Sequence, residues 1–257
     1  MIRMRNLTKC FGELKAVDDL TLDIAPGELF AFLGPNAAGK TTTIKLLAGL
    51  LRPTSGTCAI GGHDLQREPE AAKRLLAYVP DFPFLYEKLT CAEFMRFIGE
   101  MFEVEGADIP RRTGALFERF GLDEYRHELT ENLSHGTRQR LVIASALLHE
   151  PKVLIIDEPM VGLDPMHTRV VKDELKERSR AGTTIFLSTH QLEVAEELAD
   201  RIGIIGKGRL IALGTLEELR RQTSGRRELE SIFLSLIEGG EERAGEEAGS
   251  GGRKIDL

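Results

Sequence analysis

Apolar and polar positions alternate at the start of the chain and then give way to fully apolar runs. Apolar residues spaced two apart, as in a half-buried strand, are Ile2, Met4, Leu20, Leu22 and Ile24. After a turn at Pro26-Gly27, residues 29–33 are continuously apolar. A strand of this kind is buried on both faces, as in a mostly parallel sheet.

Two later segments repeat the pattern of the 29–33 run. Residues 153–156 and 184–187 are also apolar throughout, and each is followed by a polar turn and a helical pattern. A helix predicted over 42–50, closed by Arg52-Pro53, follows the first run in the same way. This alternation of strands and helices predicts an α/β fold.

The pattern changes twice more along the chain. Helical spacing replaces strand signals over 87–148, which predicts a helical subdomain inserted between the two parts of the α/β core, 1–86 and 149–214. Helical spacing returns over 215–237 and predicts a C-terminal extension. The final residues, 238–257, are rich in Gly and Glu without an aromatic residue, so we expect a disordered tail.

Composition indicates an ordinary globular protein. Of the 257 residues, 42% are hydrophobic and 29% are charged, close to average usage. The longest nearly apolar run, 141–148, falls far short of the ~20 residues that cross a bilayer. No secretory signal is visible, so a cytoplasmic location is expected. The three cysteines, Cys10, Cys58 and Cys91, lie too far apart for a CxxC site and are expected to be reduced.

The charge balance argues against nucleic acid as a partner. Lys and Arg total 34 against 41 Asp and Glu, which gives a net charge of −7, and basic residues occur in pairs at most. A nucleic-acid-binding surface requires a concentrated basic patch. An acidic chain that holds a polyanion such as ATP therefore needs a local site, such as a glycine-rich loop or a helix N-terminus.

Such a loop follows the first buried run. The segment Gly34-Pro35-Asn36-Ala37-Ala38-Gly39-Lys40-Thr41, followed by Thr42, fits G-x-x-x-x-G-K-[ST] between a strand and a helix, which is the context that the motif requires. Backbone N–H groups of the loop would wrap the α and β phosphates, and Lys40 would neutralise the β and γ phosphates. The Thr41 hydroxyl would bind Mg²⁺.

Carboxylates and a histidine end the other two buried strands. Asp157 closes the 153–156 run, and a carboxylate at that position suits Mg²⁺. The adjacent Glu158 would accept a proton from the water that attacks the γ phosphate. His190 follows the 184–187 run. A single histidine at a strand end is more often a surface residue, but ligands gather at the carboxyl ends of parallel strands, which favours contact with the γ phosphate.

A third candidate element is the start of a helix. In Leu133-Ser134-His135-Gly136-Thr137-Arg138-Gln139-Arg140, Ser134 is placed as an N-cap before a helical stretch that runs to Leu148. Taken alone, the segment indicates a capped helix. Its free N–H groups and helix dipole could also bind an anion.

Together these motifs resemble the ATP-binding subunit of an ABC transporter over residues 1–237. They occur in the family's order: the P-loop 34–42, the signature 133–139, Asp157-Glu158, the segment 162–165 (Gly-Leu-Asp-Pro), and His190. The resemblance implies a P-loop NTPase fold of ABC type, with a mostly parallel core sheet and an N-terminal antiparallel β part, and it implies ATP and Mg²⁺ as cofactors. It further implies that Phe11 stacks on adenine.

The resemblance also implies partners. Two such chains, identical or merely similar, would meet head to tail, so that one chain's signature caps the γ phosphate held by Lys40 of the other. The signature residues of this chain are Leu133, Ser134, His135, Gly136, Thr137 and Gln139. Asp164 would lie at the dimer contact. A separate integral-membrane permease would hold the pair at the inner face of the cell membrane.

Three residues depart from the family pattern. Ala37 stands where a P-loop glycine is usual, and alanine enters positive φ less readily. His135 replaces a signature glycine and adds a titratable ring. Asp81 stands where a glutamine usually contacts Mg²⁺ and the membrane subunit; a carboxylate can still bind the ion or its water. Similar sequences of exporter branches carry an acidic residue at this position, so the resemblance favours export.

Three functions are compatible with these residues. The first, which the complete motif set favours, is an ATPase that powers a permease. The second is an ABC protein that acts on ribosomes or DNA, although the chain has neither a fused second ATPase half nor a basic arm. The third is a regulatory switch that binds ATP but hydrolyses it weakly, which Asp81, His135 and Ala37 suggest and Glu158 and His190 oppose.

Overall fold

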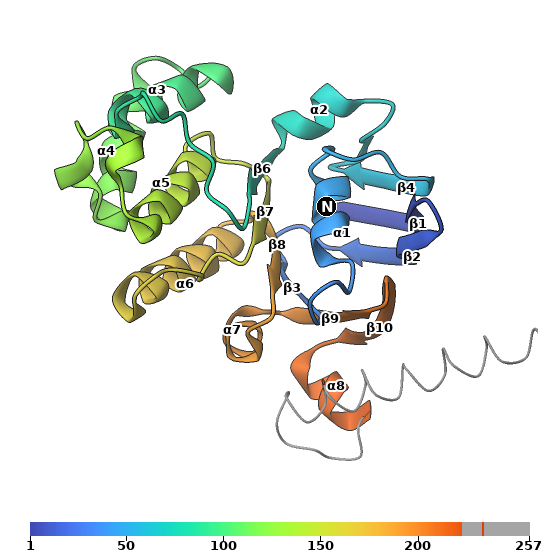
Figure 1. The fold of residues 1–257 in the computed structure, drawn as a ribbon. Coiled ribbons are helices and arrows are strands. Elements are labelled where there is room, and N and C mark those ends of the chain that lie inside the picture. Colours follow the sequence, from blue (N-terminus) through green and yellow to red (C-terminus); the bar gives the residue numbers. More distant parts are fainter. Residues whose placement is uncertain (223–232, 234–257) are drawn as a thin grey trace, which may run out of the picture.

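Two β-sheets and a group of helices form the structure (Figure 1), a computed structural model that describes residues 1–222 and Phe233. The smaller sheet is antiparallel, in the order β2-β1-β4-β5. Its strands are β1 (Ile2–Phe11), β2 (Leu14–Ile24), β4 (Ser55–Ile60) and β5 (His63–Asp64). This sheet is the antiparallel β part that the family resemblance implies.

The first two strands are longer than the alternation of apolar residues indicated. The register between β1 and β2 shifts after Met4, after Leu7 and after Lys9. Each bulge moves the next side chain to the other face, so a strand that continues structurally loses its period of two in sequence. Phe11, the last residue of β1, is brought by this extension to the edge of the nucleotide pocket described below.

The larger sheet has six strands in the order β10-β9-β3-β8-β7-β6. Its neighbouring strands run parallel except for the antiparallel pair β9 and β10. The strands are β3 (Leu29–Leu33), β6 (Leu76–Val79), β7 (Val153–Asp157), β8 (Thr184–Thr189), β9 (Arg201–Gly206) and β10 (Arg209–Gly214). The three apolar runs seen in the sequence form the adjacent central strands β3, β8 and β7, all fully buried, and the predicted α/β class is confirmed.

Helix α1 (Lys40–Leu47) lies between the two sheets and contacts strands of both. The predicted bounds of 42–50 were wrong. Gly39 at φ 108° turns the chain directly into the helix, which therefore begins at Lys40, and Gly49 at φ 64° follows its end. The other helices of the core are α2 (Pro69–Arg74), α6 (Pro165–Arg180), α7 (Leu192–Leu198) and α8 (Leu216–Gln222).

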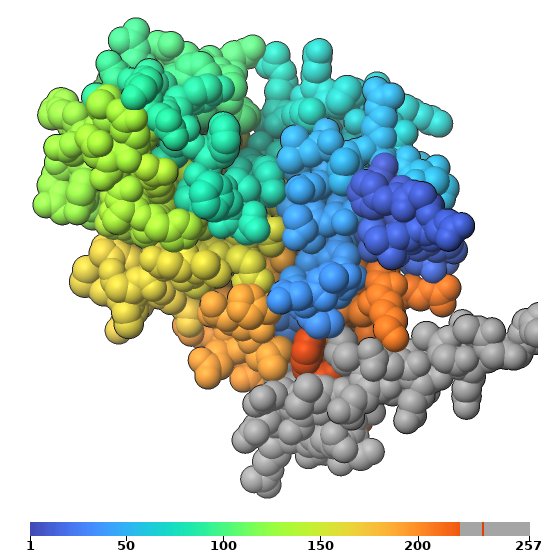
Figure 2. All heavy atoms as spheres, viewed as in Figure 1, coloured from blue at the N-terminus to red at the C-terminus, as the bar shows by residue number. Residues whose placement is uncertain are grey.

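A second lobe consists of helices and stands out in green beside the sheets (Figure 2). It contains α3 (Cys91–Met101), α4 (Asp108–Phe120), the short 3-10 turns η1 (Asp123–Tyr125) and η2 (Thr130–Asn132), and α5 (His135–Leu147). These elements occupy the region where the sequence predicts an inserted subdomain. Helix α5 packs on β6, which joins the lobe to the larger sheet. The structure has, over the part of the chain that it describes, no helix of the length and apolarity required to span a bilayer.

The structure describes only the first part of the C-terminal region for which predictions were made. Helix α8 begins the extension predicted over 215–237 and packs on β10. Apart from Phe233, the remainder of that extension and the predicted tail, 238–257, lie outside the described residues. Within the described part, all three cysteines are free thiols, as expected.

Candidate functional site

The loop between β3 and α1 is shaped by two glycines that admit no side chain. A Cβ atom on Gly34 would lie 2.6 Å from the carbonyl oxygen of Ile205, and one on Gly39 would collide with the carbonyl oxygen of Ala16. Gly39 also has φ 108°, a backbone conformation that favours glycine. The loop therefore passes tightly over β9 and β2, and its direction into α1 is fixed by backbone contacts.

Ala37 lies in this loop with φ 63°, in the left-handed region. The family resemblance implies glycine at this position. Its side chain is exposed, so the methyl group gains no packing that would offset the conformational cost of about 1 kcal/mol. The neighbouring Ala38 is buried, and its carbonyl oxygen accepts a hydrogen bond of 2.9 Å from the Gly208 N–H in the turn between β9 and β10.

The Lys40 side chain folds back under the loop. Its ammonium donates hydrogen bonds to the carbonyl oxygens of Gly34, at 2.6 Å, and Pro35, at 3.1 Å. Burial lowers the pKa of this ammonium, while the carboxylates of Glu158 and Asp157 act in the opposite direction. The positive charge is thus held directly below the loop that would cradle the phosphates.

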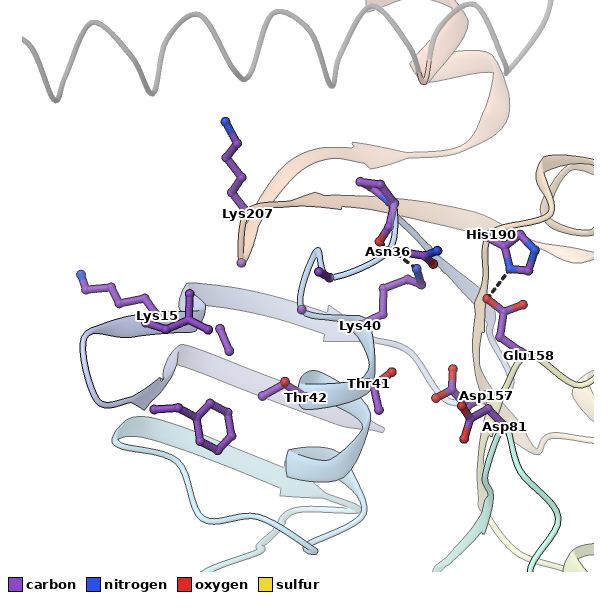
Figure 3. Close-up of a pocket in the computed structure, with 17 residues that line it drawn as sticks. Lys15, Asn36, Lys40, Thr41, Thr42, Asp81, Asp157, Glu158, His190 and Lys207 are labelled. Carbon is purple, nitrogen blue, oxygen red and sulfur yellow. Dashed lines mark hydrogen bonds and ion pairs between the residues drawn. The ribbon is translucent and has the colours of Figure 1, made fainter.

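Asp157, at the carboxyl end of β7, is buried, and its Oδ2 has no hydrogen-bond partner within the described residues. Burial raises the pKa of this carboxyl to about 6, the nearby Asp81 and Glu158 add to the rise, and Ser188 and Lys40 oppose it. A buried carboxylate oxygen without a donor is poised to bind a cation. Figure 3 shows Asp81 beside Asp157, on the side of the pocket that faces Thr41.

Thr41, Asp81 and Asp157 fit a magnesium ion. They offer oxygen atoms alone, and oxygen is the ligand that Mg²⁺ prefers. Within residues 1–222 and Phe233, no group of three or more His, Cys, Asp or Glu side chains is arranged to hold a metal. Mg²⁺ keeps several waters and is commonly shared with substrate phosphates, so a full set of protein ligands is not required here.

Glu158 and His190 form a pair across the ends of β7 and β8. Glu158 has φ 47°, and its N–H donates to the carbonyl oxygen of Ser188 at 2.9 Å. This turn directs the carboxylate away from the strand, so that Oε1 lies 2.7 Å from His190 Nδ1 and Oε2 accepts from the Thr189 hydroxyl at 3.2 Å. A non-glycine residue held at positive φ is a feature that clusters at functional sites.

The pocket that collects these groups has a volume of 680 Å³. Of the nucleotide, catalytic and metal residues expected from sequence, those that line it are Phe11, Pro35, Asn36, Ala37, Gly39, Lys40, Thr41, Thr42, Asp81, Asp157, Glu158 and His190 (Figure 3). Gly34 and Ala38, which belong to the same loop, are buried and do not line the pocket. Five further residues line the pocket and were not predicted from the sequence: Leu14, Lys15, Ala16, Lys207 and Gly208. Leu14, Lys15 and Ala16 begin β2, Lys207 and Gly208 form the turn between β9 and β10, and no local motif marks any of them.

The signature residues do not line this pocket. Ser134 is the N-cap of α5, as predicted, and its hydroxyl accepts from the Thr137 N–H at 3.2 Å. Ser134 and His135 are exposed and Gly136 is half-buried, whereas Leu133, Thr137 and Gln139 are buried. The exposed start of α5 is therefore the part of the signature that a second molecule can reach.

Asp164 is the N-cap of α6. Its Oδ1 accepts from the His167 N–H at 2.9 Å, and its Oδ2 lies 2.5 Å from His167 Nδ1. The hydrogen bond from the His167 backbone, together with that from its ring, lowers the pKa of Asp164. This carboxylate therefore remains ionised and holds the segment that connects Glu158 to α6.

The fold and the pocket define a P-loop nucleoside triphosphatase: a phosphate-binding loop joins a central parallel strand to a helix, with a lysine and strand-end carboxylates around one cavity. Comparisons with known proteins identify the family of P-loop nucleoside triphosphatases to which the chain belongs. The family profile described as ABC transporter matches residues 17–161, more than half of the chain. The chain belongs to this family, as the sequence motifs indicated, and it is an ATP-binding subunit with ATPase activity.

Individual relatives agree with this assignment. The chain is 40% identical over 220 residues to the Nod factor export ATP-binding protein I of Cupriavidus metallidurans, an alignment that covers 85% of this chain and 72% of the relative. A solved ATP-binding subunit of an ABC transporter shares 35% identity at a TM-score of 0.88, covering 92% of this chain and 99% of that one. A dimeric bacterial ABC transporter cassette shares 25% identity at a TM-score of 0.77, covering 84% and 99%.

Proposed function

We propose that this ATPase works as one half of a head-to-tail pair and transmits ATP hydrolysis to a separate membrane permease. The observation that carries the hydrolytic part is the Glu158–His190 pair, which opens into the same pocket as Lys40. A carboxylate beside the phosphate site can accept a proton from the attacking water or orient it. The pocket thus contains both a phosphate-binding group and a base.

Each residue has a defined part in this mechanism. The N–H groups of the loop and the N-terminus of α1 bind the α and β phosphates, and Lys40 exchanges its carbonyl partners for the β and γ phosphates. Glu158 orients the water for in-line attack on the γ phosphate and receives its proton. His190 fixes the rotamer of Glu158 through the 2.7 Å contact and turns its other ring nitrogen toward the γ phosphate.

Magnesium would be held by Thr41, Asp157 and Asp81, together with phosphate oxygens. When bound, the ion neutralises charge that develops between the β and γ phosphates. The buried oxygen of Asp157 supports this assignment, because an unpartnered carboxylate oxygen is costly to bury unless something binds it. Asp81 adds a second negative charge at the same point.

Phe11 is proposed to stack on the adenine ring. Its side chain is exposed at the end of β1, and the Lys9 ammonium lies 5.1 Å from the ring centroid. A flat exposed ring at the edge of the pocket offers a stacking surface for any base. Stacking of this kind contributes affinity without selecting strongly between purines.

The position of the signature supports the pairing of two chains. Ser134 and Gly136 lie outside the pocket of their own chain, at a helix N-terminus that can bind an anion. In a head-to-tail pair this helix start would meet the γ phosphate held by the other chain, and Asp164 would lie at the contact. The dimeric bacterial cassette with the same fold supports the arrangement.

An exposed aromatic patch is the proposed contact for the permease. Its exposed side chains are Phe82, Phe84 and Tyr86 of the segment after β6 and Phe97 and Met101 of α3, and the two elements meet at Tyr86 and Phe97. Phe84 is 81% exposed, and the Tyr86 and Phe97 rings meet edge to face at 5.1 Å. Large exposed apolar side chains in one area mark a binding surface. Asp81 joins this aromatic patch to the nucleotide pocket.

The proposed direction of transport is export. The carboxylate at Asp81 supports it through the family resemblance, and the Nod factor relative carries export in its name. The proposal implies a cytoplasmic location at the inner face of the cell membrane, where the permease would hold the pair.

The proposal is tested by trapping the pair. Glu158→Gln removes the base but leaves the phosphate contacts, so this variant should bind ATP and accumulate as a dimer in size-exclusion chromatography. Lys40→Ala should lose nucleotide affinity and stay monomeric with ATP. Glu118→Gln, a change at an exposed glutamate of α4, is the matched control and should behave like the unmodified chain. A Glu158→Gln variant that hydrolyses ATP at the normal rate, or stays monomeric with bound ATP, would contradict the proposal.

A further inference from the structure

Two loops of the ATPase machinery meet the start of α5 at one side chain, His135. It is the first residue of α5, beside the N-cap Ser134. The Phe82 ring lies 6.3 Å from the His135 ring, at an angle of 44°. Phe82 directly follows Asp81, whose Oδ1 accepts from the Phe82 N–H at 2.9 Å. One side of the histidine thus faces the segment that carries a proposed magnesium ligand.

The His135 ring also rests on Gly162. A Cβ atom at this glycine would collide with His135 Cδ2 and would lie 2.8 Å from Nε2, so the ring occupies the space of the missing side chain. Gly136 approaches the same loop, because its own Cβ would be 2.8 Å from the Gly162 carbonyl oxygen. Gly162 has φ 79° and tolerates no side chain without strain. The helix start and this loop are therefore fitted closely to each other.

The loop that His135 touches carries the catalytic carboxylate. It runs from Glu158 to Asp164 as tight turns, in which the Val161 N–H donates to the Glu158 carbonyl oxygen at 3.2 Å and the Leu163 N–H to that of Met160 at 3.3 Å. Its ends are held by the Glu158 N–H on Ser188 and by the Asp164 cap on α6. The hydrogen bond from the Val161 N–H to Glu158 gives a displacement at Gly162 a short path to the backbone of Glu158.

We propose that His135 is a positioning residue that links the signature start of α5 to the Glu158 carboxylate of the same chain. The inference rests on the proposed function, since the signature start is the surface offered to the partner's nucleotide. Closure onto that nucleotide presses α5 through the His135 ring against Gly162 and sets the orientation of Glu158. His135 thereby acts on hydrolysis in its own pocket, in addition to any contact across the pair.

Replacement of the ring separates this role from a contact with the partner's nucleotide. His135→Ala should lower kcat about tenfold, the order of loss expected when a reacting group is slightly misplaced, while KM for ATP stays within about twofold. In the Glu158→Gln background, His135→Ala should leave the ATP concentration needed for dimer formation unchanged. His135→Phe restores a planar ring against Gly162 and should recover most of the turnover. His127→Ala, at an exposed histidine of the same lobe, is the matched control.

Each outcome of these measurements supports or overturns the positioning role of His135. An unchanged kcat in His135→Ala overturns the positioning role, and so does an equal loss in dimer formation, which would assign the histidine to the partner's nucleotide. A His135→Phe variant as slow as His135→Ala overturns it too, because the packing would then be irrelevant. If the unmodified chain neither forms dimers nor hydrolyses ATP, the proposed function is wrong and the role of His135 is wrong with it. If the unmodified chain hydrolyses ATP normally, a negative result for the variants contradicts the role of His135 alone.

Discussion

In the nucleotide-free and metal-free chain, Asp157→Asn should gain stability relative to the unmodified chain as the pH rises to and beyond about 6. The carboxyl of Asp157 is buried, and burial raises its pKa to about 6 from the usual 3.8. The folded state therefore retains a proton that the unfolded chain has already released, so that stability falls as the pH rises between these two values. Asparagine has no proton to release and removes this loss.

The magnitude follows from the size of the shift. A rise of about two units in the pKa of Asp157 lowers the unfolding free energy by about 3 kcal/mol once the pH exceeds the folded-state pKa. Roughly half of this decrease develops between about pH 5 and about pH 8. The amide of asparagine is itself buried without a partner, which costs about 1–3 kcal/mol. That cost does not depend on pH. The difference in unfolding free energy between variant and unmodified chain should therefore grow by roughly 1.5 kcal/mol over this range, whatever its absolute value.

Urea denaturation in EDTA measures this difference. Circular dichroism is the suitable signal, because the chain has no tryptophan. Asp173→Asn, at an exposed aspartate of α6, is the matched control for the loss of one carboxylate. A flat or opposite pH dependence for Asp157→Asn would refute the account, since Asp157 would then ionise in the folded chain as it does in water.

Three further changes test other features of the site. Ala37→Gly should stabilise the chain by about 1 kcal/mol in thermal unfolding, because it relieves an exposed residue at φ 63°; a lower melting temperature would contradict this explanation. Asp81→Asn should raise the Mg²⁺ concentration for half-maximal hydrolysis, and an unchanged metal titration would restrict Asp81 to the permease contact. Phe11→Ala should weaken ATP binding about tenfold in calorimetry through lost stacking, and an unaltered affinity would remove Phe11 from the base site.

Features encoded in adjacent residues could be predicted from the sequence. The runs that became β3, β7 and β8 are buried on both faces, so their apolar residues are continuous and need no knowledge of the fold. The phosphate loop was predicted in the same way, since its two required glycines and its lysine lie within seven residues of one another. The N-cap at Ser134 was also a local signal.

Features that depend on contacts distant in sequence could not be predicted. Lys207 and Gly208 line the pocket because the β9–β10 turn is hydrogen-bonded to Ala38, and nothing near residue 208 indicates that contact. The meeting of His135 with Gly162 likewise joins two loops that are separate in the chain. The full length of β1 could not be predicted either, because register shifts break the alternation of apolar and polar residues from which a strand is predicted.

The central claim is that two head-to-tail ATPase chains, of which this chain is one, build each hydrolytic site. The steady-state ATPase rate as a function of protein concentration tests it most directly, measured for the unmodified chain and for Glu158→Gln. The account predicts that the rate of the unmodified chain rises more steeply than in proportion to concentration, and that Glu158→Gln shows no turnover at any concentration. A rate strictly proportional to concentration at the lowest measurable levels, where the chain is monomeric, would contradict it.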